Sequence, residues 1–201
     1  MADPTVLNLN KSVRDVNKQR EKRQPGLSWS SLKAEWRSWF ASKGPVLFFG
    51  AKFGALVLLL YGLLAIPFSE RILYSYLEAN AWMSNLILDA LGQGTHVTEV
   101  TIQSPGFAIA IRRGCDAVEP TWLLCAAILA FPGSFKHKLA GMFAGIVILQ
   151  LLNLVRIVTL YWIGIHFPAF FPSAHLEIWP TVFIIVAILF FVGWKGRAIE
   201  R

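Results

Sequence analysis

The stretch LAGMFAGIVILQLLNLVRIVTLYWIG, residues 139–164, is 26 residues long, and Arg156 is its only charged side chain. A helix needs about 20 consecutive, predominantly apolar residues to cross the hydrocarbon core of a bilayer. A run of this length and polarity is typical of a membrane-spanning helix. The stretch therefore predicts that the chain is embedded in a membrane.

Three further apolar runs predict additional spans. The first covers residues 46–68 and the last covers residues 179–194. The middle run must begin near Cys115 and continue to Phe135 to be long enough to cross the membrane. The first of these runs starts too far from the N-terminus, and is too long, for a cleaved secretory signal. Of the 201 residues 55% are hydrophobic and 15% charged, whereas soluble domains carry roughly 25% charge. We expect an all-α polytopic membrane protein with about four transmembrane helices.

The distribution of basic residues predicts the orientation of the chain. Nine of the 19 Lys and Arg residues lie in the first 45 positions, and basic residues beside the spans mark the cytoplasmic side. With four spans both termini are cytoplasmic, and 14 basic residues fall on inner segments against three on outer ones. We attribute the net charge of +7 to contact with membrane lipids and expect no nucleic-acid partner.

The same features divide the chain into three parts. Residues 1–45 form a basic cytoplasmic arm with a membrane-surface helix, because aromatic and basic residues alternate at helical spacing from Trp29 to Lys43. Residues 46–194 form the transmembrane domain, and residues 195–201 form a cytoplasmic tail.

The segment between the first two spans is expected outside the membrane. Apolar positions in residues 69–91 repeat every three or four residues, which predicts an interfacial amphipathic helix. Residues 97–102 and 107–111 are β-prone and flank a Gln-Ser-Pro-Gly turn, which predicts a small extracytoplasmic β-hairpin. The hairpin leads directly to Cys115, so it either contacts a substrate or acts as a structural cap.

Arg156 is the most costly side chain within the predicted spans. An intramembrane arginine usually faces the bundle interior or a water-filled cavity. Arg156 lies about 25 Å along its helix from Leu139, in the outer part of the span. Gln150 and Asn153 precede it at three-residue intervals on the same broad flank. For these two residues, hydrogen bonding between helices is the alternative to a chemical role.

Cys115 lies at the outer end of the second predicted span, beside Arg112 and Arg113. A cysteine at a helix N-terminus near cations has a lowered pKa and forms a reactive thiolate. The alternative is a small buried residue, which is the simpler role for Cys125 in the middle of the span.

His175 precedes the fourth predicted span and therefore shares the outer side with Cys115 and Arg156. Together they offer a nucleophile, a fixed cation and an acid–base group, which acyl transfer through a thioester requires. The sequence contains no Cys-x-x-Cys pair, no zinc-like His/Cys spacing and no Gly-rich phosphate loop. We therefore expect no metal and no cofactor.

Four elements occur in order over about residues 46–194: Gly114-Cys115-Asp116, Ala130-Phe131-Pro132 with a basic turn, Asn153-Leu154-Val155-Arg156-Ile157, and His175. In this order the chain resembles the exosortase/archaeosortase family, and the GCDAVEP stretch at 114–120 is similar to its exosortase H branch. The sequence has Cys-Asp-Ala where Cys-Ser/Thr-Gly is more common in the family. This departure keeps the thiol and changes the local turn.

The resemblance implies a membrane cysteine transpeptidase or protease with Cys115, Arg156 and His175 as its catalytic triad. The implied partner is the C-terminal sorting tail of an exported protein, made of a short motif, a transmembrane helix and a basic cluster. The implied location is the bacterial cell inner membrane, with the active site on the extracytoplasmic face. Supporting or substrate-binding roles are assigned to Asn153, Arg112 and Arg113.

Two other functions compete with this one. A hydrolytic, intramembrane-type cysteine protease would use the same acylation step and differ only in the acceptor of the acyl group. A non-enzymatic membrane scaffold or transporter component would explain the spans and Arg156. It would leave unexplained why Cys115 and His175 share one side of the membrane.

Overall fold

The computed structural model describes Arg14 and residues 29–199. Most of the predicted basic arm before Trp29, and the last two residues of the predicted tail, lie outside the described residues. The chain forms two compact units, Met1–Phe48 and Phe49–Arg201. The boundary lies close to the predicted start of the transmembrane domain at residue 46.

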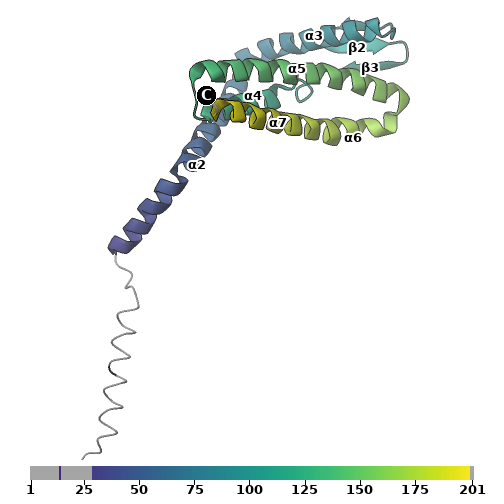
Figure 1. Cartoon of the computed structure of the whole chain (residues 1–201). Helices are drawn as coiled ribbons and strands as arrows, with labels where there is room; N and C mark the ends of the chain where they lie inside the picture. The colour runs from purple at the N-terminus through teal and green to yellow at the C-terminus, as the bar shows by residue number, and fades with distance from the viewer. Residues whose placement is uncertain (1–13, 15–28, 200–201) are drawn as a thin grey trace, which may run out of the picture. The chain divides into compact units, whose positions relative to one another are not determined.

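Helix α2, Trp29–Leu64, is 36 residues long and contains Pro45 (Figure 1). It joins the predicted surface helix and the first predicted span into one element. The helix ends at Leu64 rather than at the predicted Phe68, because Pro67 cannot donate a backbone hydrogen bond and disfavours helical geometry at the residue before it. Pro67 instead occupies the first turn of α3, where no such donor is needed.

Helix α3, Pro67–Ala90, confirms the helix predicted for residues 69–91. Its buried face differs from the predicted apolar stripe, because Asn80, Ala81 and Ser84 are buried whereas Met83 and Leu86 are exposed. Small and polar side chains allow α3 to pack closely on its neighbours; Leu77 and Leu88 are buried with them, whereas several other large apolar side chains of α3 are exposed.

A three-stranded antiparallel sheet takes the place of the predicted hairpin. Its strands are β1, His96–Thr98, β2, Thr101–Ser104, and β3, Phe107–Ala110, in the order β1-β2-β3. The β2–β3 pair, with Ile102 opposite Ile109, corresponds to the predicted hairpin. The first predicted strand is split by a turn at which Glu99 has a φ of 54°. The extra turn produces β1 as a third strand.

The second predicted span, from Cys115 to Phe135, is wrong in length. Helix α4, Val118–Ala130, has only 13 residues, about 20 Å. It begins after Ala117, whose backbone is left-handed with φ 56°, and it ends two residues before Pro132. Both features stop helix propagation, so α4 alone is shorter than a hydrocarbon core of about 30 Å.

Two later helices match the third and fourth predicted spans. Helix α5 covers Phe135–His166, and α7 covers Trp179–Ile199. Between them lie η1, Pro168–Phe170, α6, Phe171–Ser173, and a π-helical turn, η2, Ala174–Ile178. Three stretches in the described part of the chain are long and apolar enough to cross a membrane: Glu35–Leu64, Phe135–His166 and Pro168–Gly196.

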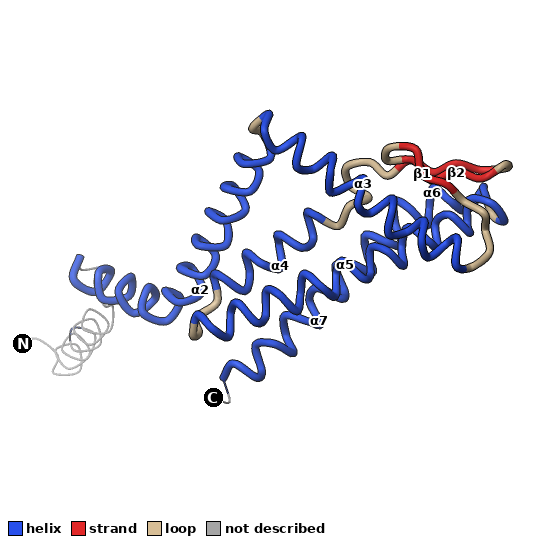
Figure 2. Tube along the Cα trace, turned by 90° about the horizontal axis from the view of Figure 1, so that it is seen from above, coloured by secondary structure: helices blue, strands red, loops and turns tan. Residues whose placement is uncertain are grey.

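Helix α5 lies beside α4 and α7 (Figure 2), and it contributes to two buried clusters in the second unit. One cluster joins it to α3 and the sheet through Leu88, Ile102 and Tyr161. The other joins it to α4 and α7 through Leu124 and Phe183. The segment from β3 to α4 connects the two clusters, and it carries Cys115.

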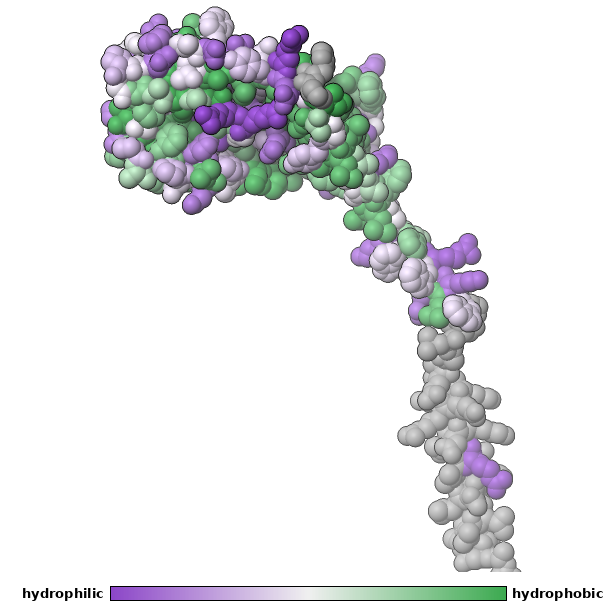
Figure 3. Space-filling model, turned by 180° about the vertical axis from the view of Figure 1, so that it is seen from behind, coloured by the Kyte–Doolittle hydropathy of each residue, from purple (hydrophilic) through white to green (hydrophobic). Residues whose placement is uncertain are grey.

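Much of the outer surface of this unit is apolar. Figure 3 shows hydrophobic surface interspersed with hydrophilic side chains on one face of the molecule. On α7 the exposed apolar side chains include Ile184, Ile188 and Leu189. A soluble domain rarely exposes a helix face of this kind, whereas a bilayer would cover it. The fold is therefore that of a mostly helical membrane protein with a small sheet.

Candidate active site

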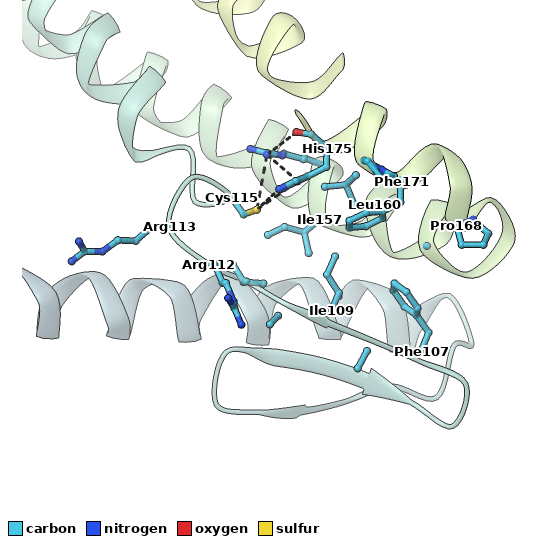
Figure 4. A pocket seen from close by; sticks show the side chains of 16 residues that line it. Phe107, Ile109, Arg112, Arg113, Cys115, Ile157, Leu160, Pro168, Phe171 and His175 are labelled. Atoms are coloured by element: carbon cyan, nitrogen blue, oxygen red, sulfur yellow. Dashed lines mark hydrogen bonds between the residues drawn. The ribbon is translucent and has the colours of Figure 1, made fainter. Parts of the chain in front are cut away.

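Cys115, Arg156 and His175 meet at one point in the second unit (Figure 4). The Cys115 Sγ atom lies 3.5 Å from Nε2 and 3.7 Å from Nδ1 of His175. Nη2 of Arg156 lies 4.0 Å from the same sulfur and 3.4 Å from Nδ1 of His175. Three segments that are far apart in sequence thus bring together the three residues that the sequence predicted as a set.

Arg156 is held by contacts on several sides. Its Nη1 donates to the backbone oxygen of Gly114 at 3.1 Å, and its Nη2 donates to the backbone oxygen of His175 at 3.4 Å. The guanidinium carbon lies 5.7 Å from the ring centroid of Phe183, a cation–π distance. The side chain is only 4% exposed. The guanidinium therefore connects the Cys115 loop to the His175 turn as a fixed charge.

The imidazole of His175 is oriented by the turn that carries it and by a neighbouring ring. His175 lies in the π-helical turn between α6 and α7. The Phe171 ring stacks on the imidazole with a centroid distance of 5.8 Å and an interplanar angle of 18°. Since π-turns occur frequently at functional sites, this local geometry suits a side chain that must reach a specific partner.

The loop around Cys115 is shaped by left-handed backbone angles and by a side-chain hydrogen bond at the start of α4. Gly114 has φ 87°, a left-handed conformation that glycine adopts without a steric penalty. The backbone N–H of Cys115 donates to the oxygen of Arg112 at 2.9 Å. Oδ1 of Asp116 accepts the N–H of Val118, the first residue of α4, at 3.2 Å. The Asp of the Cys-Asp-Ala stretch thus satisfies one backbone donor at the start of α4, although the N-cap residue is Ala117.

Burial raises the pKa of the Cys115 thiol above its ordinary value of 9.0. The positive charge of Arg156 and a backbone hydrogen bond with Arg112 both lower this pKa, and they offset the cost of desolvation only in part. The lowered pKa predicted from the position of Cys115 is therefore wrong. Burial removes water from the thiolate, and the partial charges of a helix N-terminus do not replace it. A raised pKa favours the protonated thiol at neutral pH.

We expect the alkylation of Cys115 to be slow at neutral pH and to accelerate as the pH rises beyond 9.0. The reason is that only the thiolate reacts, and a raised pKa moves its formation to higher pH. N-ethylmaleimide labelling in a Cys125→Ala background would follow Cys115 alone. A labelling rate that levels off below the ordinary pKa would contradict this expectation.

Asn153 does not touch the sulfur but belongs to a polar cluster behind the Cys115 loop. Its side-chain amide donates to Oδ1 of Asn80 at 3.0 Å, and Nε2 of Gln150 donates to the same oxygen at 2.7 Å. The Tyr76 hydroxyl contacts Gln150 Oε1 and donates to the backbone oxygen of Asp116 at 3.0 Å. The cluster therefore links α3 and α5 to the loop that carries the thiol.

Tyr76 and Asn80 were missed at the sequence level. Tyr76 falls within the repeat of apolar positions in residues 69–91, and Asn80 carries no signal in the sequence beyond being polar. The available signal was their four-residue spacing, which places both on one face of a helix.

Arg112 and Arg113 line the opening of the pocket, but their side chains point away from Cys115 (Figure 4). Arg113 Nη2 lies 3.7 Å from Oε1 of Glu70, and both side chains are more than half exposed. An exposed pair of this kind contributes little stability. Neither guanidinium supplies the positive charge next to the sulfur, a role that falls to Arg156.

Cys115, Arg156 and His175 line a cavity of about 560 Å³. Apart from Arg112 and Arg113, its remaining lining comes mainly from β3, α5 and the segment around Pro168 and Phe171, and is mostly apolar. Within Arg14 and residues 29–199, no group of three or more His, Cys, Asp or Glu side chains could hold a metal ion.

The fold and the site together define a helical membrane protein in which a buried arginine lies beside a half-buried cysteine and a half-buried histidine. Residues 39–194 match the family model described as "Transmembrane exosortase (Exosortase_EpsH)". The chain belongs to the exosortase family, which confirms the resemblance seen in the sequence motifs. No match to the chain was found among curated proteins or among solved structures.

Proposed function

We propose that the chain is a membrane cysteine transpeptidase that cleaves C-terminal sorting tails of exported proteins through a thioacyl intermediate. The observation that carries this proposal is that the His175 imidazole and the Arg156 guanidinium both lie within 4.0 Å of the Cys115 sulfur. Membership in the exosortase family supports a sorting-type transpeptidase or protease.

The geometry supports a two-step acyl transfer. His175 takes the proton from the Cys115 thiol, and the sulfur attacks a peptide carbonyl. Arg156 stabilises the negative charge on the tetrahedral oxygen. His175 then gives its proton to the leaving amine, which leaves a thioester on Cys115. An acceptor nucleophile loses a proton to His175 and attacks the thioester, and the thiol is regenerated.

The proposed site lies at the extracytoplasmic boundary of a bacterial inner membrane. From Phe135 to Arg156, α5 rises about 32 Å, close to the ~30 Å hydrocarbon core. The segment containing α4 runs alongside α5 over nearly the same distance. At one end the backbone oxygen of Gly114 accepts from Arg156, and at the other the backbone oxygen of Leu129 accepts from Lys138 Nζ at 2.9 Å. A short helix with its flanking loops would in this way complete a fourth crossing.

The acceptor distinguishes transpeptidation from hydrolysis. We expect mass analysis of a processed C-terminal-tail reporter to show an added acceptor mass at the new C-terminus. A product ending in a free carboxylate would favour the alternative of a hydrolytic cysteine protease. A scaffold or transporter role would be supported if the reporter, co-expressed with the intact chain, were never processed and no hydroxylamine-sensitive adduct formed on Cys115.

A further inference from the structure

Strand β3 has one backbone edge without a partner strand among the described residues. It pairs with β2 alone, and Ile102 lies opposite Ile109. The N–H of Ile111 donates to the oxygen of Val100 at 2.8 Å, so the odd-numbered residues of this segment direct their backbone groups toward β2. By alternation, the N–H and C=O groups of Ala108 and Ala110 point to the opposite edge.

This free edge forms one wall of the cavity that contains Cys115. All five residues from Phe107 to Ile111 line the cavity. The face of a strand would present only every second residue, whereas an edge presents all of them. The cavity therefore lies beside the edge of β3 and opens onto its unpaired backbone groups.

The opposite wall is apolar except at Arg156 and His175, and it is held at a fixed distance from the strand. It consists of α5 and the segment before His175, including Leu160, Pro168 and Phe171 (Figure 4). The Phe107 ring packs directly on the backbone of Gly164, where any larger side chain would collide with it. The same ring makes an edge-on contact with Tyr161 at 5.6 Å. These contacts hold β3 against α5 and keep the space between the walls open.

We propose that the substrate binds as an added strand along the free edge of β3. The extended segment next to the scissile bond hydrogen-bonds to the backbone of Ala108 and Ala110, and its carbonyl lies at Cys115. This inference rests on the proposed function and specifies how that site holds its polypeptide. An added strand gains affinity from the main chain and selectivity from alternate side-chain pockets.

The lining of the cavity defines the chemistry of the bound segment. Away from Arg156 and His175, a side chain directed toward α5 meets Ile157, Leu160 and Phe171, and none of these three can pair with a charge. Burial of an unpaired charge is strongly unfavourable. The side chain in this subsite is therefore uncharged and apolar.

The opposite edge of the sheet provides an internal control. Strand β1 is the other edge strand, and none of its residues lines the cavity. Both edges carry unpaired backbone groups, but only β3 lies beside Cys115. The inference therefore predicts binding at one edge of the same small sheet and not at the other.

A cross-linking experiment compares the two edges. A photoreactive amino acid would replace Ala108 on β3 or, as the matched control, Thr98 on β1, in a Cys115→Ala chain that cannot process its substrate. The probe is a secreted reporter with a C-terminal tail that the unmodified chain processes. We expect cross-links from position 108 and none from position 98. Equal cross-linking from both positions, or cross-linking from position 98 alone, would overturn the proposal.

A proline substitution tests the backbone contact itself. Ala110→Pro removes an outward N–H while leaving the ladder with β2 intact, and Ala110→Val keeps that N–H with an added side chain. We expect Ala110→Pro to process the reporter about tenfold more slowly than Ala110→Val, as loss of one hydrogen bond would allow. Equal N-ethylmaleimide labelling of Cys115 in the two variants would show an intact site.

The outcomes separate this inference from the function on which it rests. Equal processing by Ala110→Pro and Ala110→Val would refute the added-strand proposal and leave the transpeptidase proposal standing. Absence of processing by the unmodified chain would refute the transpeptidase proposal itself. If Ala110→Pro failed to label normally, the comparison of positions 108 and 98 would decide the question.

Discussion

Cys115→Ala is expected to abolish conversion of a C-terminal-tail reporter from precursor to processed form. The reason is that Cys115 carries the sulfur facing both His175 and Arg156. Without the sulfur no thioester can form, and no other described cysteine is close, because Cys125 is buried within α4. The measurement is a gel shift of the tagged reporter on co-expression with each variant in membranes.

Cys125→Ala is the matched control for the Cys115 substitution. It removes a thiol from a buried position on α4 that is not among the residues lining the cavity. We expect this variant to process the reporter at close to the unmodified rate. Full processing by Cys115→Ala would exclude this nucleophile and, with it, the proposed transpeptidase.

Arg156→Ala is expected to lower processing by about 10²- to 10³-fold, the usual effect of removing a group that stabilises an oxyanion. Arg156→Lys should recover little of this loss. The guanidinium contacts Gly114, His175 and the Cys115 sulfur through two of its nitrogens, whereas a lysine presents one ammonium. Initial rates of reporter conversion, at matched amounts of each variant in the membrane, give the comparison.

Arg113→Ala controls for the loss of a positive charge near the pocket. Arg113 is exposed, points away from the sulfur and pairs with Glu70 at the surface, so we expect little change in rate. Arg156 also connects two segments. N-ethylmaleimide labelling of Cys115 therefore reports whether the loss of Arg156 disturbs the loop that carries the thiol. Substantial rescue by Arg156→Lys would indicate that a point charge is sufficient.

The grouping of the three site residues was predictable because it follows from coarse properties of the chain. Apolar run lengths and the bias of basic residues placed Cys115, Arg156 and His175 on one side of a membrane, and the structure brings them into contact. Helix α5 was equally accessible to sequence reasoning, since 26 nearly uncharged residues permit few alternatives.

The features that escaped prediction depend on local backbone conformation and on tertiary contacts. The left-handed Ala117 that delays the start of α4, and the turn at Glu99 that creates β1, occur at residues that rarely adopt a positive φ. The raised pKa of Cys115 results from burial by segments remote in sequence. Asn153 on α5 donates to Asn80 on α3, and no periodic pattern in the sequence links these two helices in advance.

The π-helical turn at His175 has a consequence for how the chain tolerates insertions and deletions. A π-turn contains one residue more than the α-helical turn it replaces, and each residue of an α-helix advances the side-chain direction by about 100°. Deletion of one residue from Ala174–Ile178 would therefore restore regular helical phase between α6 and α7. The direction of the His175 side chain would then change by about 100° relative to α7. Phe183 and Trp194 could keep their places in the core, while the imidazole would turn away from the sulfur. The extra residue thus separates the angular position of the imidazole from the packing of the helix that follows it.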